Sequence, residues 1–200
     1  MPKNLLGLQD KFQELSSVVP DQEMELWSVV KQGASRYTTV PWLSASVCLL
    51  DKIRTCSPFA LSKICGSVSC SFRTTLSEEE FLANFGNRDK LDWEMENFHK
   101  FYFHHNFALT YWTLVREIAK ESVYVCQSVF NLPFGIISTL ACSTFTDVKH
   151  FCESNFLTRQ RFCLVSPENT YLKILTLADS QKLTPQQLTL LRLTKLKKRK

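Results

Sequence analysis

The order of patterns between Glu117 and Leu177 constrains this chain more than any other feature. Three short segments with apolar residues at helical spacing come first, and two runs rich in β-forming residues follow them. The polar sequence SPENT separates the two runs and supplies residues typical of a turn. A fold for this chain is therefore expected to place three short helices directly before a two-stranded ribbon.

The first two helices are predicted from the spacing of their apolar residues. Residues 116–130 carry apolar side chains at mostly helical spacing, and Leu132-Pro133 then interrupts the pattern. A second helix is expected to begin at Pro133, because the fixed φ angle of proline suits a first helical turn. The apolar positions of this second helix are Ile136, Ile137 and Leu140.

A third helix is expected over residues 144–156. Thr144 or Thr146 is its predicted N-cap, and Asp147 lies near the positive end of the helix. The residues predicted to face inward are Phe145, Val148, Phe151 and Cys152.

The period of the pattern changes after Leu157. The runs 161–165 and 171–177 favour strands, and the proline and asparagine between them favour a turn, so a β-hairpin is expected. Three helices followed by a hairpin predict a winged helix. Such a unit is small, and we expect it to dock on the helical part upstream. The alternative is that the three helices and the ribbon only close a core.

The chain before residue 117 is predicted to be helical. Helices are expected over 4–17, 21–32, 42–55 and 58–70, with prolines 20, 41 and 58 at or before their starts. Ser77 and Glu80 form a capping box for a further helix, and Gly86 fits its C-cap. Residues 91–105 and 106–130 are expected to form an antiparallel helix pair like those of helical-repeat scaffolds.

The predicted fold class is therefore mainly α, with helix pairs followed by a C-terminal winged-helix subdomain that carries a small β-hairpin. A helical subdomain is expected over 1–116 and the winged helix over 117–178. Residues 179–200 are expected to form an amphipathic helix from Thr184 with a basic tail.

Composition and motifs argue against several classes of protein. No apolar run reaches the roughly 18 residues that cross a bilayer, so no membrane partner is expected. The eight cysteines lack the spacing of a zinc site and are expected to be reduced, mostly buried thiols of an intracellular protein. Known catalytic and nucleotide-binding motifs are missing from the sequence, so we expect neither an enzyme nor a cofactor.

The net charge of +5 is unevenly placed, because KLKKRK at the C-terminus contributes five positive charges. Such a run fits a nuclear localisation signal, a nucleic-acid contact or a solvated helix end. We expect a nuclear protein, with a share in the cytoplasm left open. The cations of the tail are Lys195, Lys197, Lys198, Arg199 and Lys200.

Two groups of residues are candidates for binding. In a winged helix, the third helix and the wing present cations to phosphates. The candidate contacts of this kind, beside the tail, are Lys149, His150, Arg159, Arg161 and Lys173. They are sparse, so only weak binding to RNA or DNA is expected. Aromatic residues dominate both cores and interfaces, and the candidate partner-binding residues are Phe98, Phe101, Tyr102, Phe162 and Leu172.

A family resemblance rests on two motifs. The run Asn97-Phe98-His99-Lys100-Phe101-Tyr102 resembles the Asn-aromatic-x-basic-Phe-aromatic motif of the GANP/Sac-type mRNA-export branch of PCI domains. Leu132-Pro133, the helix through Leu140-Ala141, and then Phe151 and Leu157 resemble the Leu-Pro and Phe-containing helix pattern of the same branch.

The resemblance covers residues 95–178 and implies a non-enzymatic nuclear scaffold. Such a scaffold is a subunit of a multiprotein complex, pairs with another protein subunit such as a second PCI protein, and offers a basic surface to RNA. Two alternatives stay open. One is a winged-helix protein that binds DNA or RNA in its own right. The other is a helical regulatory or viral host-interaction protein.

Overall fold

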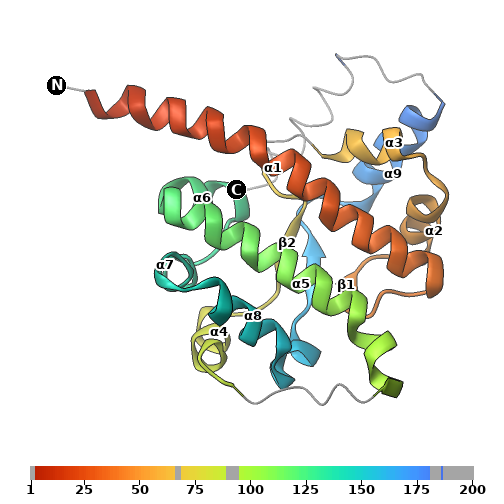
Figure 1. The fold of residues 1–200 in the computed structure, drawn as a ribbon. Coiled ribbons are helices and arrows are strands. Elements are labelled where there is room, and N and C mark those ends of the chain that lie inside the picture. Colours follow the sequence, from red (N-terminus) through yellow and green to blue (C-terminus); the bar gives the residue numbers. More distant parts are fainter. Residues whose placement is uncertain (1–2, 66–68, 89–94, 181–185, 187–200) are drawn as a thin grey trace.

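Two long helices, α1 (Lys3–Arg36) and α5 (Met95–Glu121), pack against each other and run in opposite directions (Figure 1). They belong to a computed structural model that describes residues 3–65, 69–88, 95–180 and 186, with side chains except at 3–18 and 95–100. The described part is mainly helical, as the sequence predicts.

The shorter helices form two groups around this pair. At one end lie α2 (Val47–Thr55), α3 (Pro58–Ile64) and α9 (Glu168–Asp179), and α9 packs against both of the others (Figure 1). The second group lies at the other end and comprises α4 (Glu78–Phe85), α6 (Val123–Phe130), α7 (Phe134–Cys142) and α8 (Phe145–Glu153). A short 3-10 helix, η1 (Asn155–Arg159), follows α8.

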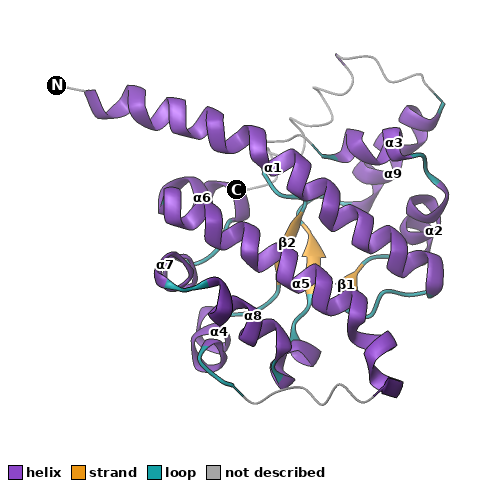
Figure 2. Ribbon diagram, in the orientation of Figure 1, coloured by secondary structure: helices purple, strands orange, loops and turns teal. Residues whose placement is uncertain are grey.

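A small sheet lies between the two groups of helices (Figure 2). Its strands are β1 (Leu43–Ser44), β2 (Phe72–Thr74) and β3 (Phe162–Leu164), in the order β1-β3-β2. β3 runs parallel to β1, where Leu43 pairs with Phe162, and antiparallel to β2, where Thr74 pairs with Phe162. The sheet therefore joins residues 43–74 to residues 162–164, far later in the chain.

The predicted hairpin is wrong. Residues 162–164 form a strand, but residues 171–177 lie within α9, and the described partners of β3 are β1 and β2. The apolar residues of this segment recur at helical spacing as Tyr171, Ile174, Leu175 and Ala178, and all four are buried. Pro167 and the residues after it begin a helix and not a hairpin turn. The predicted winged helix thus lacks its wing.

The three helices predicted before the hairpin are confirmed, with shifted bounds. The first predicted segment covers the end of α5 and all of α6, because Ser122 breaks the helix and caps α6. Thr144, one of the two predicted N-caps, begins α8 and forms a capping box with Asp147. Phe145 was expected to face inward, but its side chain is 49% exposed.

Two breaks that the sequence predicts between helices, near Pro20 and between residues 105 and 106, are absent. Pro20 lies inside α1, where buried residues such as Val19, Leu26 and Val30 hold the helix against the rest of the molecule. The antiparallel pair predicted for 91–130 is wrong, since α5 continues without a break from Met95 to Glu121. This stretch contains neither glycine nor proline, so no residue interrupts it.

The other helices predicted before residue 117 are shorter in the structure. The helix expected over 42–55 is β1 followed by α2, and the helix expected over 58–70 is α3, which ends at Ile64. The capping box of Ser77 and Glu80 and the C-cap at Gly86 are confirmed. The C-terminal amphipathic helix expected from Thr184 lies outside the described residues, apart from Gln186.

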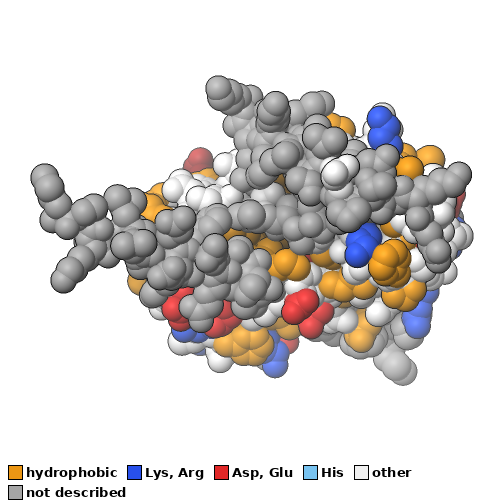
Figure 3. All heavy atoms as spheres, turned by 90° about the horizontal axis from the view of Figure 1, so that it is seen from above, with side chains coloured by type: hydrophobic (Ala, Val, Ile, Leu, Met, Phe, Trp, Pro, Cys, Tyr) orange, Lys and Arg blue, Asp and Glu red, His pale blue; other side chains and the backbone are white. Residues whose placement is uncertain are grey.

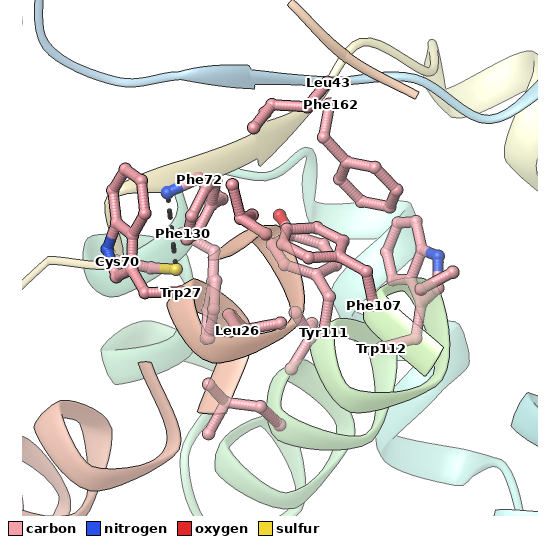
Figure 4. Close-up of a cluster of buried hydrophobic side chains, with 14 of the residues drawn as sticks. Leu26, Trp27, Leu43, Cys70, Phe72, Phe107, Tyr111, Trp112, Phe130 and Phe162 are labelled. Atoms are coloured by element: carbon pink, nitrogen blue, oxygen red, sulfur yellow. Dashed lines mark hydrogen bonds between the residues drawn. The ribbon is translucent and has the colours of Figure 1, made fainter. Parts of the chain in front are cut away.

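One hydrophobic core joins the two halves of the chain (Figure 4). The ring centroids of Trp27 and Phe72 lie 4.5 Å apart, and those of Phe107 and Phe162 lie 4.8 Å apart. Tyr111 also packs against Phe162, at 5.0 Å. The predicted boundary between residues 116 and 117 falls inside α5, the helix that carries several of these rings.

Candidate partner-binding groove

A groove of about 610 Å³ lies between α1, α3 and α5. Its lining combines apolar, hydroxyl, amide and cationic side chains. The lining residues are Met24, Ser28, Lys31, Gln32, Ser35, Arg36, Pro58, Leu61, Tyr102 and Phe103. In the view from above, hydrophobic side chains reach the surface on the right with Lys or Arg side chains among them (Figure 3).

The α1 wall of the groove is one stripe of the helix. Met24, Ser28, Lys31 and Ser35 follow one another at intervals of three or four residues and so share a face. The hydroxyl groups of Ser28 and Ser35 donate hydrogen bonds to the carbonyls of Met24 and Lys31, each at 2.8 Å. Both hydroxyls thus keep their acceptor lone pairs available to a ligand.

The α3 wall is held in place by its own N-cap. Ser57 caps α3, and Pro58 occupies the first helical position, which suits its fixed φ angle. Asp179 at the end of α9 accepts hydrogen bonds from Ser57 and from Lys52, the latter at 2.7 Å. These contacts attach the start of α3, which carries the lining residues Pro58 and Leu61, to the end of α9.

The α5 wall is aromatic. Phe103 is 4% exposed, and among the described residues its ring packs against Arg36, Tyr102 and Tyr37. The guanidinium group of Arg36 lies 5.4 Å from its centroid, and the rings of Tyr102 and Tyr37 lie 5.3 Å and 6.3 Å away. Tyr102 lines the groove and is 41% exposed, whereas Tyr37, which is 38% exposed, packs on Phe103 from outside the lining.

The charges that line the groove are positive. Lys31 and Arg36 are cations, and none of the described residues that line the groove is a carboxylate. Lys31 is half-buried, and its ammonium group donates a hydrogen bond to the carbonyl of Cys56. Burial raises the pKa of the Cys56 thiol, although the nearby Lys31 acts to lower it. This thiol therefore stays neutral at pH 7 and adds no negative charge beside the groove.

The predicted partner-binding residues lie at the groove, away from it, or in the core. Tyr102 lines the groove, and Phe101 lies half-buried next to it. Leu172 is half-buried on α9, which packs against α2 and α3, while the side chain of Phe98 lies outside the described part. Phe162 is 0% exposed in the core, so its assignment to a binding surface is wrong.

The predicted nucleic-acid contacts do not form one surface. Lys149 and His150 lie on α8, whereas Lys173 lies on α9 at the opposite end of the molecule (Figure 1). Arg159 ends η1, and Arg161 donates hydrogen bonds to the carbonyls of Thr158 and Gln160 at 2.6 Å and 2.9 Å. The five cations of the tail, from Lys195 to Lys200, lie outside the described residues.

A second, polar hollow of about 430 Å³ contains one of these cations. Arg159 lines it together with the side chains of Asn84, Asn87, Asn155, Phe156 and Thr158. Asn84 uses its amide to donate a hydrogen bond to the carbonyl of Glu80 at 2.8 Å, which fixes it on α4. Its lining is mostly polar, with Phe156 as its apolar member among the described residues, so it offers little to anchor a partner.

The α1–α3–α5 groove was not visible in the sequence, apart from Tyr102. Serines at helical spacing on α1 fit an ordinary solvent-facing stripe as well as a groove wall. Within 3–65, 69–88 and 95–180, no group of three His, Cys, Asp or Glu side chains could hold a metal ion. None of the helices described is both long and apolar enough to cross a membrane.

No protein-family model matches this chain, and no curated protein or solved structure matches it either. The resemblance to PCI domains therefore stays a prediction. The function has to follow from the geometry of the groove and the charges around it.

Proposed function

We propose that this protein is a non-enzymatic interaction scaffold, a subunit of a multiprotein complex, and that it binds a partner protein through the α1–α3–α5 groove. The observation that supports this most is the position of Tyr102. It is 41% exposed, lines the groove and lies beside the buried ring of Phe103. Tyrosine and arginine at the edge of an apolar hollow are typical anchors of protein interfaces.

The size of the groove favours a segment of a partner over a broad domain surface. Its volume of about 610 Å³ accommodates a few side chains. A standard interface between two folded domains covers roughly 800 Å² on each partner and is flatter. We therefore propose that the partner inserts a short segment, and that surrounding residues add contacts at the rim.

The proposal keeps the nuclear location and the weak RNA contact that the sequence suggests. The basic run 195–200 supports both, and exposed Arg159 and Arg161 could add phosphate contacts. The PCI-like character rests on α6, α7 and α8, because α9 stands where the sequence predicts the second strand of a wing.

Co-purification of a variant with a truncated groove tests the proposal. Tyr102→Ala removes an exposed ring from the groove, and Tyr124→Ala is the matched control, since Tyr124 is 74% exposed on α6. Tyr102→Ala is expected to reduce recovery of a specific partner by about tenfold, the effect of roughly 1.4 kcal/mol of binding energy. Tyr124→Ala should leave it unchanged.

Quantitative mass spectrometry of proteins purified with each variant gives the measurement, and binding of the purified partner to both variants confirms that the contact is direct. The proposal fails if every associated protein is recovered equally with Tyr102→Ala and the unaltered chain. It also fails if Tyr124→Ala causes the same loss.

A further inference from the structure

We propose that the groove recognises an acidic segment in which Asp or Glu side chains flank one or two large apolar side chains. This inference rests on the proposed function, because it names the chemistry of the segment that the scaffold binds. It follows from three features of the groove: its apolar floor, its unbalanced positive charge and its limited size.

The apolar floor supplies the site for a large hydrophobic side chain. Met24 comes from α1, Leu61 from α3 and Phe103 from α5, so three separate helices converge on the same space. Leu61 and Phe103 are buried and belong to the main core, which makes this floor rigid. Met24 is half-buried and has an adaptable side chain, so it can adjust to different apolar groups.

The two cations at the groove have no carboxylate partner within the described residues. Neighbouring cations on α2 differ in this respect: Lys52 pairs with Asp179 at 2.7 Å, and Arg54 pairs with Asp51 at 2.6 Å. Lys31 donates to a backbone carbonyl, and Arg36 lies over the ring of Phe103. A carboxylate from a partner would therefore meet two positive groups without displacing an existing ion pair.

Arg36 is the better placed of the two for a charged ligand. It is exposed, and its contact with the Phe103 ring limits the conformations of its side chain. A guanidinium group that is held beforehand loses less entropy on binding a carboxylate and can donate two parallel hydrogen bonds to it. Acidic residues at the rim should add specificity and faster association, and the apolar residue should supply most of the affinity.

The same features count against nucleic acid and against a basic segment. Two cations are few for tracking a phosphate backbone, so the groove lacks the positively charged track that a nucleic acid needs. The basic run 195–200 of this chain carries the same sign of charge as Lys31 and Arg36, so the groove should repel it. Both ligands are useful competitors in a test.

Selection of peptides against the full chain tests the inference. A phage-displayed library of random dodecapeptides should yield binders that contain at least two Asp or Glu residues around a large apolar residue. Fluorescence anisotropy of the best binder should show about tenfold weaker binding to Arg36→Glu and a marked loss of affinity with added salt. Replacing the acidic residues of the peptide by lysine should restore part of the binding to Arg36→Glu.

Arg88→Glu is the control, because it makes the same charge change at an exposed arginine outside the groove. It should leave the affinity unchanged. The inference is overturned if no peptide is selected, if the selected peptides are neutral or basic, or if both variants bind equally. Stronger binding of a ten-nucleotide oligouridine or of a synthetic KLKKRK peptide would also overturn it.

These results can be separated from a failure of the proposed function. If Tyr102→Ala abolishes partner recovery but the selected peptides are not acidic, the groove binds a partner of other chemistry and only this inference is wrong. If Tyr102→Ala also leaves all partners in place, the scaffold function at this groove is wrong as well.

Discussion

The carboxylate of Glu168 accepts a hydrogen bond from the backbone N–H of Ser46 at 2.8 Å, although 122 positions separate the two residues. Its other oxygen accepts from the Ser46 hydroxyl group. At the opposite end of α9, Asp179 accepts from the N–H and the hydroxyl of Ser57, both at 3.2 Å. Since Ser46 and Ser57 are the N-caps of α2 and α3, carboxylates tie both ends of α9 to positive helix ends.

Loss of the Glu168 carboxylate should weaken the attachment of α9. Glu168→Ala is expected to lower the free energy of unfolding by about 0.5–2 kcal/mol, because it removes charge-assisted hydrogen bonds from a helix start. Urea unfolding followed by circular dichroism measures the change. Glu25→Ala, at an exposed position on α1, should alter stability by less than about 0.5 kcal/mol. Equal effects of the two substitutions would show that the contact to Ser46 contributes little.

The position of Phe162 in the core predicts a stability effect and not a specific binding effect. Phe162→Ala should lower the free energy of unfolding by about 3–5 kcal/mol, because it leaves a cavity among Phe107, Tyr111 and their neighbours. Phe145→Ala changes an aromatic side chain that is 49% exposed and should cost well under half as much. Guanidinium chloride unfolding compares them, and similar costs would contradict the burial of Phe162.

Tyr102 and Phe103 are adjacent but should respond differently to truncation. Tyr102→Ala is expected to change the free energy of unfolding by no more than about 0.5 kcal/mol, since its side chain lies at the surface. Phe103→Ala should cost about 3 kcal/mol or more, because its ring is almost fully buried. Thermal unfolding of both variants tests this. A large loss of stability in Tyr102→Ala would mean that its binding defect reflects unfolding.

His104 should make the fold sensitive to acid. Burial, and to a lesser extent the charge of Arg161, lower the pKa of His104 to about 3. A histidine in an unfolded chain has a pKa of about 6.5, so between these two values the unfolded chain binds the proton more readily. The free energy of unfolding should therefore be fully maintained above about pH 6.5 and should fall as the pH drops toward 3.

The variant His104→Phe isolates this contribution. It removes the titrating group and keeps an aromatic ring to stack on Trp42, whose centroid lies 5.8 Å from that of the imidazole. Urea midpoints measured from about pH 4 to pH 7 should change less in the variant than in the unaltered chain. Some dependence is expected to persist, because burial also lowers the pKa of His105. Identical pH profiles would rule out His104 as a source of acid sensitivity.

The parts of the fold that the sequence predicted well are those governed by neighbouring residues. The capping boxes of Ser77 with Glu80 and of Thr144 with Asp147 act over three residues, and both are present. Proline at position 133 marks the start of α7 for a similar reason. Each of these signals depends on local backbone geometry, so no knowledge of distant contacts was needed.

The predictions from the sequence were wrong where a segment favours a helix and a strand almost equally. Residues 171–177 are rich in β-formers, yet their apolar residues also fit a helix, and contact with α2 and α3 selected the helix. The strand 162–164 was predicted, but its partners at Leu43 and Phe72 lie far away in the chain. The pairing of strands that lie so far apart in the sequence depends on which side chains can be buried together. Phe162 is buried, and it pairs with Leu43 of β1 and with Thr74 of β2.

The sequence by itself determined that this protein is mainly helical, where several helices begin and end, and that its thiols lack the spacing of a zinc site. Only the tertiary structure decided that α9 replaces a wing, that Phe162 is core, and that Tyr102 shares a groove with Met24 and Leu61. The physical reason is the distance along the chain over which each interaction acts. Caps and helical spacing act within one or two turns, whereas a groove built from α1, α3 and α5 exists only after three distant segments have packed.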